Sequence, residues 1–210
     1  MQASRNGSTV VATVGIAIAL AVGFGVHFSA KKRSEQRAIV TVVGDTTEQL
    51  RTTLKSASPK GLDKVEGNLE IAKGWSSPEL VDAAEQYLIG AREILKRRAE
   101  ANRLAQKAAA SRAALSAHMT RAGQRDTDWI RNASTLKKQV ERDHFDLDIQ
   151  LKALADLLDD LPQANKRLAP HVQASLLLED DVRKAARQDV LAEAKRASAE
   201  LEKVRSILPR

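Results

Sequence analysis

The chain of 210 residues contains no cysteine, only five prolines, and few aromatic side chains, which make up 3% of it. The absence of cysteine excludes disulfide bonds, thiol catalysis and thiolate metal sites. The shortage of aromatic residues leaves few large side chains to fill a deep core. Charged residues make up 29% of the chain, both signs are interspersed, and the alternation typical of strands is missing. This composition indicates long helices and coiled coil.

Catalytic motifs are also missing, because the chain has no glycine-rich phosphate loop, serine elbow or HExxH sequence. Of the four histidines, only His144 has neighbours of metal-ligand type, Glu141 and Asp148, about one helical turn away. Further ligands would have to come from another helix, and none stands out. We therefore interpret this stretch as a solvated acidic face, and we expect a non-enzymatic protein with no metal, no other cofactor and no small-molecule substrate.

The longest hydrophobic stretch lies near the N-terminus, where twenty residues from Thr9 to Phe28 contain no acid, lysine or arginine. About twenty apolar residues cross the hydrocarbon core of a bilayer as an α-helix. We expect a short tail over residues 1–8 and a transmembrane helix over residues 9–30. A cleaved secretory signal is the alternative, but its apolar core is usually shorter, and Phe28 stands where a cut after Ala30 needs a small residue.

Basic residues flank this stretch mainly on its C-terminal side, at Lys31, Lys32, Arg33 and Arg37, whereas Arg5 stands alone in front of it. Lysine and arginine are retained on the cytoplasmic side of membranes. The sequence therefore predicts a single-pass protein of a bacterial-type inner membrane, with these four side chains at the membrane surface. The helical body is placed on the cytoplasmic side, and the periplasmic side stays open as the alternative.

The net charge of +7 and the isoelectric point near 9.8 allow either nucleic acid or an anionic lipid surface as a partner. One basic cluster, at residues 31–33, lies beside the predicted span, where lipid headgroups are the nearest anions. The other, at residues 96–98, is surrounded by Glu93 and Glu100. No basic and aromatic motif of the RNA-binding kind is present. The lipid bilayer is therefore the expected partner, and nucleic acid is disfavoured.

Proline and glycine divide the remaining chain into helical segments. We expect a juxtamembrane helix over residues 31–58, a short helix with turns over 59–77, and a long helical hairpin over 78–161. Ser77 and Pro78 form a helix start signal. Pro162 is expected to end the hairpin, because proline opposes helix continuation. The residues 162–210 then form a connector and a last helix that begins near His171.

From Leu80 onward the apolar residues recur at alternating steps of four and three, which is the seam of a coiled coil. Polar residues often fix register or partner choice in such a seam. They interrupt it here at Arg98, Arg112, Asp126, Asp143 and Gln150. A turn near Gly123 would fold the segment into a hairpin, with an unbroken rod as the alternative. The interaction seam is expected at Leu80, Tyr87, Ile94, Leu115, Met119, Trp129, Leu136, Val140, Leu147, Leu154 and Leu161.

The sequence thus predicts an all-α protein, with one transmembrane helix followed by amphipathic helices in a hairpin or coiled-coil-like bundle. We expect a scaffold or tether that self-associates or binds another protein through its seams. An extracytoplasmic ligand-sensing bundle is an alternative, and it would need a pocket lined by Tyr87, Arg98 and Arg112. A secreted periplasmic helical protein is the other alternative, if the N-terminal segment is a cleaved signal.

Overall fold

The computed structural model describes residues 34–56, 61–120 and 126–207, and every regular element among them is helical. The predicted all-α fold is therefore confirmed for these residues. The chain divides into two compact units, residues 1–41 and 42–210. The predicted span over residues 9–30, and with it Lys31, Lys32 and Arg33, lies outside the described residues. The helices that are described include none with an apolar stretch long enough to cross a bilayer.

The first unit contributes a short helical stretch, residues 34–41. Within it, the hydroxyl of Thr41 donates to the carbonyl oxygen of Arg37 at 3.1 Å, as expected for residues four apart on a helix. Arg37, the last of the four expected membrane-surface residues, therefore stands on a helix. The fold of the second unit is described below by itself.

The second unit begins with helical residues 42–56, followed by α2 (Leu62–Lys73) and α3 (Pro78–Thr120). Gly61 precedes α2 with φ at 80°, a left-handed conformation that favours glycine. Gly74 ends α2 as the sequence predicted. At the start of α3, the amide of Leu80 donates to the hydroxyl oxygen of Ser77 at 3.4 Å. The start signal read at Ser77 and Pro78 is therefore confirmed.

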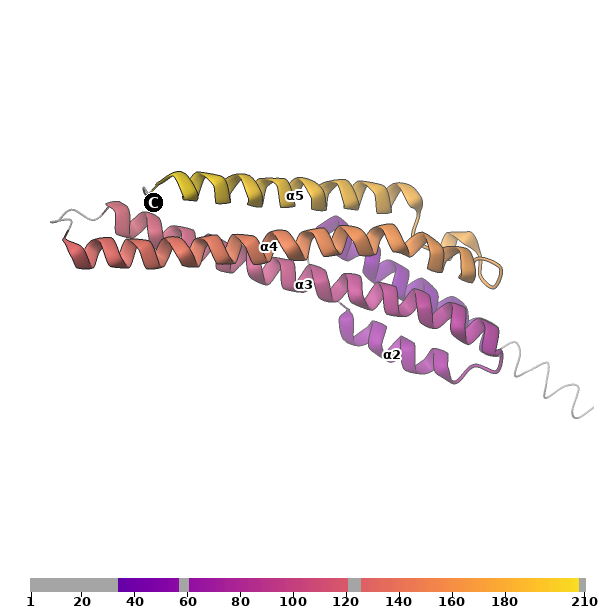
Figure 1. The fold of residues 1–210 in the computed structure, drawn as a ribbon. Helices are drawn as coiled ribbons and strands as arrows, with labels where there is room; N and C mark the ends of the chain where they lie inside the picture. Colours follow the sequence, from indigo (N-terminus) through magenta and orange to yellow (C-terminus); the bar gives the residue numbers. More distant parts are fainter. Residues whose placement is uncertain (1–33, 57–60, 121–125, 208–210) are drawn as a thin grey trace, which may run out of the picture. The chain divides into compact units, whose positions relative to one another are not determined.

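Helix α4 (Thr127–Leu168) packs along α3, so the hairpin is confirmed and the unbroken rod is excluded (Figure 1). The side chain of Asp126 caps α4 by accepting from the amide of Trp129 at 2.8 Å. The Trp129 ring stacks on His118 of α3, with ring centroids 5.0 Å apart. This contact joins α3 and α4 near the end of one and the start of the other. Gly123 itself lies outside the described residues.

The predicted end of the hairpin at Leu161 is wrong, because α4 continues through Pro162 to Leu168. Proline has no amide hydrogen, so the carbonyl oxygen of Leu158 lacks its usual donor four residues later. The guanidinium of Arg183, on the next helix, supplies a replacement through Nη1 at 3.1 Å. A tertiary hydrogen bond therefore satisfies the carbonyl that the proline leaves open, and the helix runs on.

The predicted start of the last helix near His171 is also wrong. A 3₁₀ turn, η1 (Ala174–Leu176), follows α4, and α5 (Asp180–Ile207) begins nine residues after His171. Extended backbone at Leu177 precedes α5, and the side chains of Leu177 and Leu178 are buried. Burying these two leucines competes with helix formation there. Asp180 and Asp181 then stand in the first turn of α5, where acidic side chains complement the helix dipole.

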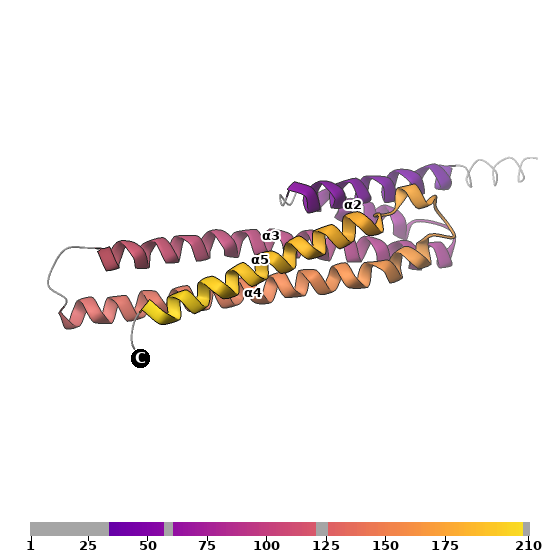
Figure 2. The same ribbon diagram turned by 90° about the horizontal axis from the view of Figure 1, so that it is seen from above.

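Helix α5 runs back over the hairpin, along α4 (Figures 1 and 2). Leu115 of α3, Val140 of α4 and Val204 of α5 form one cluster of the shared core. Alanines on the inner face of α3 allow close approach of the neighbouring helices; the buried ones are Ala83, Ala84, Ala91, Ala101 and Ala108. The core is therefore built from alanine together with leucine and other aliphatic side chains.

Candidate functional site

The predicted interaction seam is filled by helices of the same chain. Met119 and Leu136 pack on the cluster of Leu115, Val140 and Val204, and Trp129 stacks on His118. The remaining predicted seam residues are buried: Leu80, Tyr87, Ile94, Leu115, Val140, Leu147, Leu154 and Leu161. The heptad pattern therefore identifies the core of the hairpin and of its contact with α5. A second protein would have to bind the chain on another surface.

Three polar residues of the seam, Arg98, Arg112 and Asp143, form ion pairs between helices. Arg98 of α3 donates through both terminal nitrogens to Glu193 of α5, at 2.8 and 2.9 Å. About four turns further along α3, Arg112 pairs with Glu200 of α5 at 2.8 Å. Lys107 of α3 lies 2.8 Å from Asp143 of α4. These pairs tie α3 to both neighbours, which matches the register-fixing role expected of polar seam residues.

Asp143 is the most deeply buried acid of this set, since its side chain is 1% exposed. Burial disfavours the ionised carboxylate, but hydrogen bonds from Lys107, Gln139 and Ser111 outweigh this cost, and the pKa of Asp143 lies below its usual value. The Gln139 side-chain amide donates to the carboxylate at 2.8 Å. Asp143 is therefore held as a structural anion inside the hairpin.

His144 is buried, with 5% of its surface exposed, so the interpretation of this stretch as a solvated acidic face is wrong for His144. Neither ring nitrogen has a hydrogen-bond partner among the described residues. Burial lowers the pKa of His144, and the nearby Arg112 guanidinium lowers it further, whereas Glu200 and Asp143 act in the opposite direction. The ring is therefore neutral at physiological pH. The sequence signal that was overlooked is the adjacency of His144 to the seam residue Asp143.

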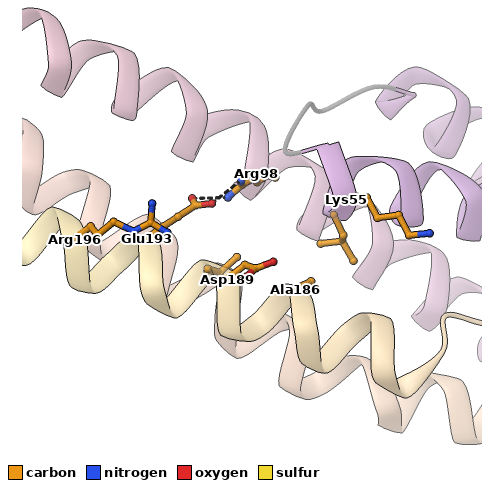
Figure 3. Close-up of a pocket in the computed structure, with 8 residues that line it drawn as sticks. Lys55, Arg98, Ala186, Asp189, Glu193 and Arg196 are labelled. Carbon is orange, nitrogen blue, oxygen red and sulfur yellow. Dashed lines mark hydrogen bonds and ion pairs between the residues drawn. The ribbon is translucent and has the colours of Figure 1, made fainter.

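An open groove runs between helical residues 42–56 and α5 (Figure 3). One part of it has a volume of about 160 Å³ and another about 470 Å³, and the two share Leu54, Lys55, Ala186 and Asp189. Arg98 reaches the first part, but its guanidinium is already engaged by Glu193. The remaining charges, Lys55, Asp189 and Arg196, are of both signs, so the groove offers no concentrated charge to a ligand.

The groove beside α5 does not bring Tyr87, Arg98 and Arg112 together, as the ligand-sensing alternative requires. Tyr87 is fully buried, and its hydroxyl lies 2.6 Å from the hydroxyl of Thr47, which donates in turn to the carbonyl oxygen of Leu176. Arg98 lines the groove beside α5, but neither Tyr87 nor Arg112 lines it. Burial raises the pKa of Tyr87 to about 12, against a smaller lowering effect of the Thr47 hydrogen bond. Tyr87 is therefore a core residue.

The face of α4 that points away from the core carries two large apolar side chains. Phe145 is 54% exposed and Ile149 is 45% exposed, and the two are four residues apart on one face of the helix. Exposed large apolar side chains that adjoin one another mark interaction sites more often than scattered ones do. Both residues lie off the heptad positions of the seam, which here are occupied by Leu147 and Leu154. The sequence therefore indicates that the seam does not bury them.

No group of three or more histidine, aspartate or glutamate residues suited to a metal ion occurs in the described part of the chain. Comparison of the chain with models of protein families, with curated proteins and with solved structures finds no match. The exposed face of α4 around Phe145 and Ile149 is therefore the candidate functional site, because two large apolar side chains adjoin there on one helix and both are exposed.

Proposed function

We propose that this chain is a non-enzymatic, single-pass membrane-anchored scaffold, in which residues 9–30 span a bacterial-type inner membrane and the helical bundle binds protein on the cytoplasmic side. The observation that carries the proposal is the exposed apolar pair on α4, Phe145 and Ile149, on a bundle whose seam is already filled. The twenty-residue apolar stretch from Thr9 and the basic residues that follow it support the anchor.

Several features of the bundle support a scaffold more than a catalyst or a ligand sensor. Two of its buried charged residues are engaged between helices: Arg98 pairs with Glu193, and Asp143 pairs with Lys107. Such pairs fix the register of neighbouring helices. The groove beside α5 is the feature that favours ligand sensing. However, Arg98, the most buried cation that lines it, is already paired with Glu193. A bundle with buried ion pairs and an exposed pair of adjoining apolar side chains on α4 fits the scaffold better.

Membrane fractionation of the full chain tests the anchor. We expect the chain to stay with membranes through alkaline extraction and to retain peptides that cover residues 9–30. The variant Ile18→Arg/Ala21→Arg should be released, because each arginine at the centre of a span costs about 2.5–3.5 kcal/mol. Arg5→Ala is the matched control outside the span. Recovery of a soluble chain without its first thirty residues would replace the anchor with the secreted alternative.

Crosslinking with mass spectrometry in intact cells tests the scaffold. We expect crosslinks from the bundle to a protein, with contacts centred on the outer face of α4. A topology reporter fused after Arg210 should show the cytoplasmic side. A bundle that forms no protein crosslinks and instead binds a small molecule beside α5 would contradict the scaffold and favour the sensor.

A further inference from the structure

The outer face of α4 continues beyond its apolar pair as an exposed stripe with heptad spacing. The stripe runs through Lys138, Arg142, Phe145, Ile149, Lys152 and Asp156, at steps of four and three, and every member is exposed. Asp160 follows one turn later on the same side. A stripe of this period is the geometry by which two helices pack along each other. The face is therefore shaped for another helix.

The charges along this stripe are distributed about Ile149. Arg142 lies seven residues before Ile149 and Asp156 lies seven after it. Lys138 lies eleven residues before it and Asp160 eleven after it. Seven and eleven residues correspond to about two and three helical turns, so all four stay on one side of α4. The charges of the first half of the stripe are basic, and those of the second half are acidic apart from Lys152, with the apolar pair between them.

These four charges are also the ones that the fold leaves unused on this face. Lys138, Arg142, Asp156 and Asp160 take part in none of the ion pairs found among the described residues. Lys152 is the exception on the stripe, because it binds Asp148 at 2.6 Å. The unpaired charges therefore lie at the two ends of the stripe, and the exposed apolar residues lie at its centre.

We propose that this stripe binds a second copy of the chain, with the two α4 helices antiparallel and the two-fold axis at Ile149. In that arrangement, a residue n positions before Ile149 faces the residue n positions after it in the other copy. Arg142 then faces Asp156 of the second copy, and Lys138 faces its Asp160. Ile149 meets its own counterpart, and Phe145 lies against Ala153. A parallel pair would instead place each charge against its own like.

The inference rests on the proposed scaffold function, since it names the partner of that surface. Two-fold symmetry strengthens it, because each favourable pair occurs twice in the dimer. The helix dipoles of an antiparallel pair are also aligned favourably. Because the apolar contact is small and centred on Phe145 and Ile149, we expect a dimer that is reversible and that weakens as salt concentration rises.

The absence of cysteine makes single-cysteine crosslinking of the full chain a direct test, in detergent or in lipid bilayers. Ile149→Cys should form a disulfide-linked dimer when treated with a mild oxidant. Arg142→Cys alone should not, because antiparallel helices separate the two copies of that position by about 20 Å, well beyond disulfide reach. A mixture of Arg142→Cys and Asp156→Cys chains, carrying different tags, should form the mixed dimer.

Ile89→Cys is the matched control, because Ile89 is also an isoleucine and is 40% exposed, on α3. Equal crosslinking of Ile89→Cys and Ile149→Cys would show random collision and overturn the proposal. Efficient crosslinking of Arg142→Cys to itself would show a parallel pair and overturn it as well. A chain that forms no dimer at about 100 µM in any of these experiments would also overturn it.

Charge reversal gives a second test that does not depend on a disulfide. Arg142→Asp should weaken dimerisation of the full chain about tenfold, because it replaces two symmetric attractions with two repulsions. The variant Arg142→Asp/Asp156→Arg should restore it, and unchanged thermal melts would show that the bundle is intact. If neither variant changed the dissociation constant of the dimer, the proposal would be overturned.

The outcomes for the dimer and for the proposed function are distinguishable. A monomeric chain that stays in the membrane, and whose Ile149→Cys variant links to a different protein, would overturn the second copy and leave the scaffold standing. A soluble chain that forms the antiparallel dimer would overturn the anchor and leave the dimer standing.

Discussion

Arg183 of α5 donates through Nη1 to the carbonyl oxygen of Leu158 in α4 at 3.1 Å. That carbonyl is the one that Pro162 leaves without an amide donor, so one residue far along the chain compensates for a proline inside a helix. The same guanidinium also lies 3.3 Å from Asp180 and 3.5 Å from Asp159. Arg183 is largely buried, which makes its hydrogen bonds worth more than those of a surface arginine.

The first prediction concerns this pair. Arg183→Met should lower the free energy of unfolding by about 1–3 kcal/mol, because the buried carbonyl of Leu158 loses its donor. Pro162→Ala supplies an amide to the same carbonyl, so the double variant Arg183→Met/Pro162→Ala should lose less than Arg183→Met does. Urea denaturation of the four chains measures the coupling as a double-mutant cycle. Strictly additive effects would contradict the role given to Arg183.

A second prediction concerns the buried anion Asp143. Lys107→Met should cost about 1–3 kcal/mol, because it removes the cation from a carboxylate that water does not reach. Lys73→Met is the matched control: Lys73 is as exposed as Lys107, at 48% against 46%, but its partner Glu70 is 70% exposed. That exposed pair contributes at most about 0.5 kcal/mol. Equal losses for both variants, measured by urea denaturation, would show that burial of Asp143 does not matter.

A third prediction follows from the lowered pKa of His144. A base with a depressed pKa binds its proton less readily when folded, so the unfolded state takes up more protons as the pH falls below about 6.5. Stability is therefore full above that pH and declines below it, by at most about 1.4 kcal/mol per pH unit. His144→Leu should flatten this part of the stability profile, as measured by urea denaturation at several pH values.

His171→Leu is the control for His144, because His171 is exposed in the connector. A His144→Leu profile as steep as that of the parent would refute the assignment of this dependence to His144.

A fourth prediction uses the single tyrosine of the chain. Burial raises the pKa of Tyr87 to about 12, so the absorbance of tyrosinate should appear only near that pH in the folded protein. In the urea-unfolded chain it should appear near pH 10. Because a raised pKa disfavours the ionised form in the folded state, stability is full below about pH 10 and falls above it.

Thr47→Val gives a second test of the titration of Tyr87. The hydrogen bond to Thr47 lowers the pKa of Tyr87, so removing that hydroxyl should move the titration to still higher pH. Titration of the folded chain near pH 10 would mean that solvent reaches the phenol, contrary to its burial.

The elements of the hairpin could be predicted because their signals are local. The start of α3 at Pro78, the end of α2 before Gly74 and the break between the two arms each depend on a few neighbouring residues. The heptad spacing also selected side chains that are buried, such as Ile94 and Leu154. The period of the apolar residues indicates which face of a helix is buried. It does not indicate whether the helix that covers this face belongs to the same chain.

The candidate site was missed for the same reason. Phe145 and Ile149 are ordinary apolar residues in the sequence, and they become distinctive only when α3 and α5 cover the other faces of α4. Likewise His144 differs from an exposed histidine only because α5 packs over it. The seam pattern places Phe145 and Ile149 off the buried positions, but only the packed bundle shows that no other described helix covers them.

The sequence by itself determined that this protein is helical, where its helices pair and which residues avoid water, because capping, helix breaking and hydrophobic period act within a few residues. The tertiary structure alone decided that the seam closes within one chain, that α4 passes through Pro162, and which face of α4 stays exposed. Each of these depends on a partner far away in sequence, such as Arg183 for Leu158 or Glu193 for Arg98, and packing brings such partners together.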